Sequence, residues 1–489
     1  MKMLTKNKST KISTPTSENI STGSQIFIFQ FSIFPYLCGM KKAIQDFNLA
    51  YYILLPVSIL ATRCHYRQVV IRGRKNLPRG GHYIIAPCHQ NALMEPMAVL
   101  YFMHRSTVFL ARADIFAKPA IRAFLTFLKI LPVYRIRDGK SALSKNEEIF
   151  ETSKKVLLDH TPLCLMAEGR HNDRHQLLPL VKGMFRIAGE TQRELGDTPL
   201  YIVPAGIDFD DYEQPYSNLV VDIGTPIPVQ PFMEEFVTDE PVALNQMREK
   251  LAEKLKQQMH HIASQKYYDE VMALCDLLNA SWRKRQHRRN TAWGRFATRR
   301  DIAVHFNRLV DDRSEETPGA ILQARDWLNR CKQLHLDSRS TAFSWPCAVT
   351  LALTATIGAF VAATIIWQPL QSALLWILLC NPIILLPTHL LTRRLIKDPQ
   401  FRSSVNYGIR LVLSLLYVLA CSIAVACTHG PAWGCLALLT ALATARINAL
   451  IHPLLRNWLH NLHYCWHCVI HPSEIKQLRQ IQRQLEEQI

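Results

Sequence analysis

Short apolar runs alternate with longer amphipathic stretches through the first half of the chain. Runs of five to seven residues rich in Val, Ile and aromatic side chains are typical of strands, and the stretches between them have the apolar spacing of helices. This alternation predicts an α/β domain over residues 66–232, with a mixed, largely buried sheet flanked by helices. The predicted strands are 69–73, 83–87, 107–111, 131–136, 163–167, 201–207 and 219–223.

The pattern changes after the predicted sheet. Pro241 precedes a stretch rich in Lys, Glu, Gln and Leu, which predicts a long helix through about Leu278. The segment from Arg283 to Arg313 then contains ten Lys and Arg residues against three Asp. We therefore expect residues 233–340 to form a helical, basic linker region.

The last third of the chain contains two blocks without any charged residue, 340–392 and 411–445. Helices of soluble proteins normally carry a polar face, so a soluble all-helical core is the weaker alternative. We expect three to four transmembrane helices within residues 341–455 and a helical tail over 456–489. The candidate spans are 346–367, 369–390, 411–428 and 432–451, the last interrupted by Arg446.

Charges beside these spans predict their orientation. The connection from Arg393 to Arg410 carries five Lys and Arg residues against one Asp, whereas the turns near Gln368 and Gly430 carry no charge. Because positively charged loops stay on the cytoplasmic side, we expect both the α/β domain and the tail to be cytoplasmic. The chain is then integral to the inner membrane.

The N-terminal region divides into two parts. Residues 1–39 begin with a stretch rich in Lys, Ser and Thr, which predicts a poorly ordered extension. Met40 opens a sequence typical of an amphipathic start, so we expect residues 1–39 to lie upstream of the native start. Residues 40–65 are apolar and aromatic but short, with Pro56 inside, which predicts interfacial membrane helices; a helix packed on the domain is the alternative.

Composition narrows the class of partner. The 489 residues have a net charge of +18, 48% hydrophobic residues and a mean hydropathy of zero, which excludes disorder as the main state. Such a basic balance indicates a polyanionic partner, and the uncharged blocks favour anionic membrane lipids, so we expect no nucleic acid. Cys465 and Cys468 lie among several histidines, where an aromatic, His-rich helix beside a membrane is favoured over a metal site.

The candidate chemistry begins where the predicted strand at 83–87 ends. His89 and Glu95 lie six residues apart in a helix expected to start near His89, and they converge only if that start is irregular. A carboxylate that fixes the tautomer of an imidazole and stabilises its charged form favours general-base chemistry. Taken alone, the spacing fits a structural histidine better. No G-x-S-x-G motif accompanies the pair, and Cys88 is disfavoured as a nucleophile.

Two later strand ends carry basic side chains. Guanidinium groups match phosphate oxygens, so strand ends that present arginines beside the His and Glu pair predict a crevice for an anionic substrate. Each cluster taken singly also fits a solvated loop. The candidate substrate-binding residues are Arg135, Arg137, Glu168, Gly169, Arg170 and Arg174.

These motifs, in this order, resemble those of the PlsC-like superfamily of glycerol-phosphate and lysophospholipid acyltransferases. His89 and Glu95 are similar to the family's His-and-acid motif, with Glu in place of Asp and one position later. Residues similar to its second, third and fourth motifs follow, with Ala167 in place of the usual Pro; they are 131–137, 166–169 and 202–206. The resemblance spans about residues 47–229.

The resemblance implies transfer of a fatty acyl group from a thioester, on coenzyme A or acyl carrier protein, to a glycerol hydroxyl, with no cofactor and no metal. His89 would deprotonate the acceptor hydroxyl, and Glu95 would orient and stabilise His89. The four arginines are candidates for the acceptor phosphate, and Glu168 would bind an acceptor hydroxyl or hold an arginine in place.

The expected acceptor is 1-acyl-glycerol-3-phosphate, in phospholipid biosynthesis. Glycerol 3-phosphate, dihydroxyacetone phosphate or an acceptor without phosphate is the alternative within enzymes. The alternative of another class is a membrane scaffold that has lost activity, for which Glu95 in place of Asp is the motive.

Overall fold

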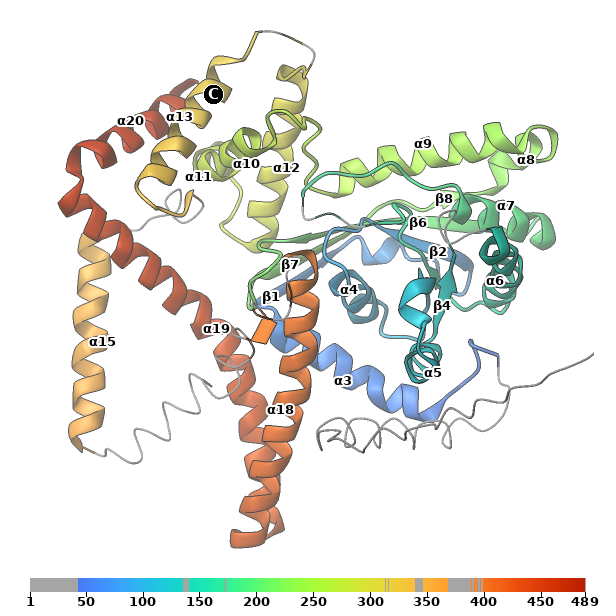
Figure 1. Cartoon of the computed structure of the whole chain (residues 1–489), viewed down its shortest axis with the longest axis horizontal. Helices are drawn as coiled ribbons and strands as arrows, with labels where there is room; N and C mark the ends of the chain where they lie inside the picture. The colour runs from blue at the N-terminus through green and yellow to red at the C-terminus, as the bar shows by residue number, and fades with distance from the viewer. Residues whose placement is uncertain are drawn as a thin grey trace, which may run out of the picture.

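The computed structural model describes residues 43–134, 140–170, 174–312, 316–338, 346–367 and 399–488, together with isolated positions between them. An eight-stranded sheet lies at the centre of the first half, in the order β1-β7-β6-β2-β5-β3-β4 with β8 beside β6 (Figure 1). The strands are β1 Gln68–Arg72, β2 His82–Pro87, β3 Val108–Arg112, β4 Ile130–Val133, β5 Leu163–Cys164, β6 Leu200–Phe209, β7 Asn218–Ile223 and β8 Ile227–Pro228.

The sheet is mixed, as the sequence predicts. Its pairs are parallel except where β6 runs antiparallel to β7 and to β8. The predicted strand at 163–167 is too long, because β5 ends at Cys164 and the chain then turns, with the Gly169 N–H donating to the Met166 carbonyl at 3.1 Å. The parallel strands β2, β3, β4 and β5 therefore end at one edge of the sheet, where their loops gather.

Both faces of the sheet are covered by helices. Side chains alternate along a strand, so Ile84 and Ile85 of β2 enter different cores, and all six residues of β2 are buried. One core packs against α6 (Lys140–Leu158), α7 (Gly183–Leu195) and α9 (Glu240–Gln258); the other packs against α3 (Leu49–His65) and α4 (Met94–Met103). Two short helices, α5 (Pro119–Phe127) and α8 (Met233–Thr238), flank β4 and α9. The predicted fold class, an α/β domain with a largely buried sheet, is confirmed.

The predicted helix from Pro241 to about Leu278 is wrong, because it is broken in the middle. Helix α9 ends at Gln258 and α10 (Tyr268–Leu277) begins ten residues later. The C-terminal end of α9 lies against β6, where a Cβ on Gly206 would come within 1.9 Å of the Gln258 carbonyl oxygen. The chain leaves the helix there, and the Ile262 N–H donates to the His175 carbonyl at 2.7 Å.

The helices that follow form a second core of their own. Leu274, Phe306 and Trp327 are buried in it together with side chains of the C-terminal helix. Its members are α10, α11 (Asn279–Arg285), α12 (Ala292–Leu309), α13 (Gly319–Gln333), the end of α19 (Pro431–Ile470) and α20 (Pro472–Gln488).

Several arginines of the basic segment 283–313 form ion pairs with carboxylates of the same chain. Helix α12 packs on β1 and β7, and its arginines pair with carboxylates beneath it. Nη2 of Arg299 lies 2.7 Å from an oxygen of Asp276, and Nη1 of Arg300 lies 3.0 Å from an oxygen of Asp222. The first pair joins α12 to α10 and the second docks α12 on β7, so contact with anionic lipid stays a prediction for the remaining arginines only.

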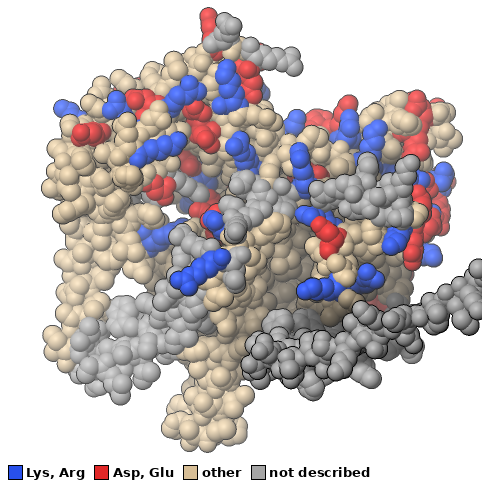
Figure 2. All heavy atoms as spheres, in the orientation of Figure 1, with Lys and Arg blue, Asp and Glu red and all other residues tan. Residues whose placement is uncertain are grey.

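Two helices of the described residues are long and apolar enough to cross a membrane, Phe401–His429 and Pro431–Ile470. They form a hairpin of α18 (Pro399–His429) and α19 that projects away from the sheet (Figure 1). Helix α15 (Cys347–Trp367) contacts the C-terminal part of α19 and extends toward the same side (Figure 1). The projecting end of the hairpin shows neither blue nor red atoms in Figure 2. The candidate span at 369–390 lies outside the described ranges, as do residues 1–39; α19 continues unbroken past residue 455.

The hairpin is docked on the α/β domain through polar contacts at its upper end. The Arg446 guanidinium, which interrupts the apolar pattern of α19, donates to the carbonyls of Arg63, Tyr66 and Arg67 at 2.7–3.4 Å. Because the last carbonyls of a helix lack partners within it, Arg446 caps the C-terminal end of α3. Residues 49–65 form a single helix, α3, and its place at a membrane interface stays a prediction.

Candidate active site

The predicted pair lies in the turn between β2 and α4. The helix begins at Met94 and not near His89, and Ala92 in the turn has a φ of 43°, in the left-handed region. The turn folds back because the backbone N–H groups of Gln90 and Asn91 both donate to Oε1 of Glu95, the former at 2.9 Å. The irregular start that the spacing required is therefore built by Glu95 itself.

His89 and Glu95 are brought together by this turn. Nδ1 of His89 lies 3.4 Å from Oε2 of Glu95, whose side chain is fully buried while the histidine keeps 16% of its surface exposed. Glu95 also lies in the first turn of α4, at the positive end of the helix dipole, and accepts two backbone N–H groups. A buried carboxylate thus faces one ring nitrogen of a histidine that solvent can still reach.

Glu168 braces the turn from the other side. Its Oε1 accepts the N–H of His89 at 2.7 Å, and its Oε2 accepts the N–H of Leu178, also at 2.7 Å. Burial raises the pKa of Glu168 to about 7, against the opposing effect of these two N–H groups. Both carboxylate oxygens accept backbone N–H groups, so Glu168 positions His89. This role is additional to the two that the sequence predicts, which are binding an acceptor hydroxyl and holding an arginine.

The remaining predicted residues lie around this centre or outside the described part of the chain. Gly169 has a φ of 65°, and a Cβ there would come within 3.1 Å of Val181, so glycine suits the turn that carries Glu168. Arg170 and Arg174 are both exposed, and the Arg174 guanidinium stacks over the Tyr268 ring at 4.8 Å. Arg135 and Arg137 lie outside the described residues.

Cys88 does not have the surroundings of a nucleophile. It is fully buried, and its sulfur exchanges hydrogen bonds with the backbone of Ile207 at 3.1 and 3.3 Å. Burial raises the pKa of the Cys88 thiol well above its ordinary value, so the thiolate is disfavoured. The sulfur instead fixes the start of the turn against β6.

A buried polar chain that sequence reasoning missed leads away from the turn. The Tyr212 hydroxyl donates to Oε1 of Gln90 at 2.9 Å, and Nδ2 of Asn91 donates to the Tyr212 carbonyl at 3.1 Å. The same hydroxyl lies 3.0 Å from Nδ1 of His175, which lies 3.0 Å from Oδ1 of Asp208. These residues are scattered over more than a hundred positions with no motif spacing, so no sequence signal groups them.

Helix α18 also contacts the turn. Oγ of Ser404 accepts the N–H of Leu93 at 3.0 Å, at the position just before α4 begins. Nearby, the Tyr407 hydroxyl lies 3.3 Å from the hydroxyl of Thr62 in α3, and the Tyr407 ring is buried in the core that also contains Met94. A helix three hundred residues away in sequence thus takes part in the packing of the turn.

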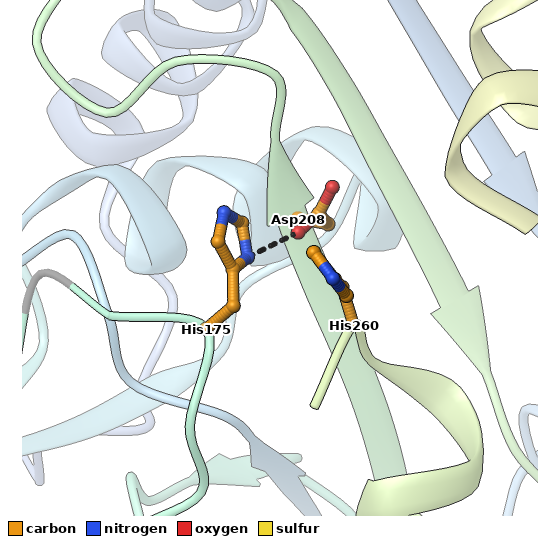
Figure 3. A group of neighbouring side chains, drawn as sticks. All are labelled: His175, Asp208 and His260. Atoms are coloured by element: carbon orange, nitrogen blue, oxygen red, sulfur yellow. Dashed lines mark ion pairs between the residues drawn. The ribbon is translucent and has the colours of Figure 1, made fainter. Parts of the chain in front are cut away.

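One group of side chains has the composition of a metal site. His175, Asp208 and His260 are all buried, and their ligand atoms lie within 4.8 Å of one another (Figure 3). They lie behind the turn and contribute no atom to the His89 and Glu95 pair. Gln90 and Tyr212 connect the two groups.

The chain is similar to known proteins over part of its length. Residues 68–208 match the family model described as Acyltransferase. No curated protein sequence matches the chain. Among solved structures, the chain is similar to the 1-acyl-sn-glycerophosphate (LPA) acyltransferase PlsC from Thermotoga maritima, at 17% identity and a TM-score of 0.31, over 48% of this chain and 91% of that one. The matched region begins with β1, ends in β6, and contains the turn with His89 and Glu95 together with Glu168. Over residues 68–208 the chain thus matches an acyltransferase domain.

Proposed function

We propose that this protein is a membrane-bound enzyme that transfers a fatty acyl group from a thioester to 1-acyl-glycerol-3-phosphate, in phospholipid biosynthesis. The observation that carries the proposal is the pairing of His89 with the fully buried Glu95 at the carboxyl end of β2, inside the region that matches the acyltransferase family. In an open sheet this end is where ligands bind.

The pair suits general-base catalysis without a covalent enzyme intermediate. With the Nδ1 proton of His89 directed at Glu95, the lone pair of Nε2 takes the proton of the acceptor hydroxyl. The acceptor oxygen attacks the thioester carbonyl carbon and forms the new C–O bond. As the C–S bond breaks, the imidazolium returns its proton to the departing thiolate, so atoms and charge balance.

Glu95 stabilises the step in which His89 is positively charged. Its carboxylate is fixed by two backbone donors and removed from water, so it needs no rearrangement when the imidazolium forms. The longer side chain of Glu, compared with the usual Asp, is accommodated because the turn of residues 88–93 wraps around the carboxylate. Loss of activity through Glu95, the motive for a scaffold, therefore has no support in the geometry.

The phosphate of the acceptor calls for cations near the turn. Arg170 and Arg174 are exposed on the loop that follows Glu168, and we propose them, with Arg135 and Arg137, as candidates for bidentate contact with phosphate oxygens. The stacking of Arg174 on Tyr268 leaves its guanidinium edge available to an anion. Acyl-CoA and acyl carrier protein both remain candidates for the donor.

A membrane setting is supported by the two long apolar helices, by their exposed apolar side chains and by the contact of α18 with the turn. A lysophospholipid acceptor and the acyl chain of the donor both partition into a bilayer. We propose that the hairpin α18–α19 crosses the inner membrane and that the acyltransferase domain lies on its cytoplasmic side.

An acceptor panel tests this function. Purified full-length protein in detergent is given acyl-CoA or acyl carrier protein thioester with 1-acyl-glycerol-3-phosphate, glycerol 3-phosphate, dihydroxyacetone phosphate or monoacylglycerol. We expect the highest kcat/KM with 1-acyl-glycerol-3-phosphate. Preference for glycerol 3-phosphate would replace the acceptor, and no transfer with any pair would support the scaffold, most clearly if Glu95→Asp then restored activity.

A further inference from the structure

The buried group of His175, Asp208 and His260 has no part in the acyl-transfer chemistry. Each side chain comes from a different segment: the loop after Glu168, strand β6, and the break between α9 and α10. The three residues are 0–5% exposed. In Figure 3 the two imidazoles and the carboxylate lie next to one another between these segments, and a dashed line marks the ion pair of His175 and Asp208.

The distances are close to those of a coordinated divalent metal. Nδ1 of His175 lies 3.0 Å from Oδ1 of Asp208, and two ligand atoms on a tetrahedral zinc are about 3.3 Å apart. The imidazole centroids of His175 and His260 are 4.5 Å apart, near the roughly 5 Å of two imidazoles on one zinc. The widest ligand pair is within 4.8 Å, so one side chain closes by about 1.5 Å when the ion binds.

The buried Asp208 carboxylate is only partly compensated by positive charge. Asp208 is 2% exposed, and an ionised carboxylate removed from water is costly unless a positive charge compensates it. The Arg299 guanidinium also attracts Asp208, but it lies 2.7 Å from Asp276 and 3.3 Å from Asp210, so other carboxylates share its charge. A divalent ion held by two neutral imidazoles would complete this compensation.

The backbone brings the third ligand into place by a specific device. Gly206 and Asp208 are two positions apart on β6 and therefore point to the same face. Only a residue without a Cβ at 206 lets the Gln258 backbone lie against the strand, and His260, two residues later, then lies beside Asp208. The broken helix, which the polar pattern does not predict, serves to deliver this histidine.

We propose that His175, Asp208 and His260 form a binding site for one divalent transition metal, Zn²⁺ by preference. The set of two imidazoles and one carboxylate suits a borderline ion, and full burial of the ligands suits a closed structural zinc more than an iron centre with open positions. The Tyr212 hydroxyl, 3.0 Å from Nδ1 of His175, is placed to complete or support the shell. The ion fastens the loop after Glu168 to β6 and to the α9–α10 break, behind the catalytic turn.

Metal analysis of the full-length protein tests this site. We expect about one zinc per chain after purification without chelator, loss of that zinc on treatment with a strong chelator, and a fall in Tm of several degrees that added Zn²⁺ reverses. Replacement by Co²⁺ should give the visible d–d absorption of a site with nitrogen and oxygen ligands. These measurements need no variant and no substrate.

Variants assign the ion to these residues. His260→Ala and Asp208→Asn should each lose the bound metal and the Tm response to Zn²⁺. His82→Ala is the matched control, because His82 is an equally buried histidine on β2 whose Nδ1 bonds to the Leu157 carbonyl, and its metal content should be unchanged. A chain without stoichiometric metal whose Tm ignores both chelator and added Zn²⁺ would show a hydrogen-bonded network only and overturn the proposal; predominance of iron or manganese would overturn the choice of zinc.

Discussion

The α/β domain and the C-terminal hairpin differ in where their apolar side chains lie. In the domain, apolar side chains fill two cores, and charged groups such as Glu95 and Glu168 are buried with hydrogen-bond partners. In the hairpin, large apolar side chains point outward; Val412, Leu416, Leu419, Ile423 and Leu439 are all more than half exposed. The same chain thus carries one region built for water and another whose surface suits a bilayer.

The difference is sharpest where the two regions meet. Polar contacts gather at the upper end of the hairpin, where Ser404, Arg410 and Arg446 bond to the domain, and the apolar surface begins below them. The Arg410 guanidinium also lies over the Tyr216 ring at 4.5 Å. The hairpin is thus fastened to the domain beside the turn that holds His89, and the following variants test how strongly each region depends on the other.

The largest effect short of removing His89 is expected from Glu95→Gln. The amide keeps the size of the side chain but cannot stabilise the imidazolium or accept two backbone N–H groups as an anion does, so kcat should fall by roughly 10²–10³. Single-turnover and steady-state assays in detergent would measure it. The control is Glu213→Gln. Glu213 is an exposed carboxylate at the seam, the boundary where α18 contacts the α/β domain, and the variant should keep wild-type kcat. Equal loss in both variants would contradict the assignment of roles.

A smaller, pH-dependent effect is expected from Glu168→Gln. Because burial raises the pKa of Glu168 to about 7, its ionised form, which accepts both N–H groups, is lost as the pH falls below neutrality. Wild-type kcat/KM should then show a fall below neutrality that comes from protonation of Glu168. The variant should be about tenfold slower at pH 8 and should lack this part of the pH dependence.

Stability should respond to Glu168 with the opposite sign. A carboxyl whose pKa is higher in the folded state than its model value of 4.5 makes the folded protein bind more protons between pH 4.5 and about 7. The free energy of unfolding therefore falls as the pH rises through this window. Tm of the wild type should drop from pH 5 to pH 7.5 relative to that of Glu168→Gln, and parallel Tm curves would refute the shift.

A loss of a few fold is expected from Ser404→Ala in α18. The substitution removes the acceptor of the Leu93 N–H, a donor at the start of α4 that has no partner within the helix, at a cost of about 1 kcal/mol. We expect kcat to fall about threefold to tenfold with KM for the acyl donor unchanged. Thr428→Ala, at the far end of α18 and bonded only to its own helix at Ala424 and Val425 in the described structure, is the matched control. If Ser404→Ala and Thr428→Ala had the same kcat, the contact of the hairpin with the turn would have no influence on catalysis.

The smallest effect is expected from Arg402→Met at the same seam. Nη1 of Arg402 lies 3.3 Å from an oxygen of Glu213, but both side chains are substantially exposed, and such pairs contribute about 0–1 kcal/mol. Activity should change less than twofold, and Tm by a degree or two. A tenfold loss would show that the seam depends on surface charge more than on the buried contacts of Ser404 and Arg446.

The sequence predicts those parts of the molecule that depend on local pattern. The seven strand runs and the apolar helices are read from periodicity, and the turn around His89 is read from a motif. The break after Gln258 is not, because its cause is a close approach to Gly206, fifty residues earlier. Tyr212, His175 and Ser404 likewise have no local signal, since they reach the turn only through tertiary packing.

The role of Glu168 shows the limit within a recognised motif. Residue type alone allows a carboxylate at this position to bind substrate, hold an arginine or hold backbone. Only coordinates show that its two oxygens accept the N–H groups of His89 and Leu178. A motif therefore predicts which residues gather at a site, and the hydrogen-bond partners of each side chain then determine its role.

The rate of acyl transfer by His89→Ala, measured beside wild type, tests most directly whether His89 is the general base. Purified full-length protein in detergent is supplied with acyl-CoA and 1-acyl-glycerol-3-phosphate, and folding of the variant is checked by its Tm. We expect a fall in kcat of at least about 10³ with KM for both substrates little changed. A folded His89→Ala enzyme that transfers acyl groups at the wild-type rate would contradict it.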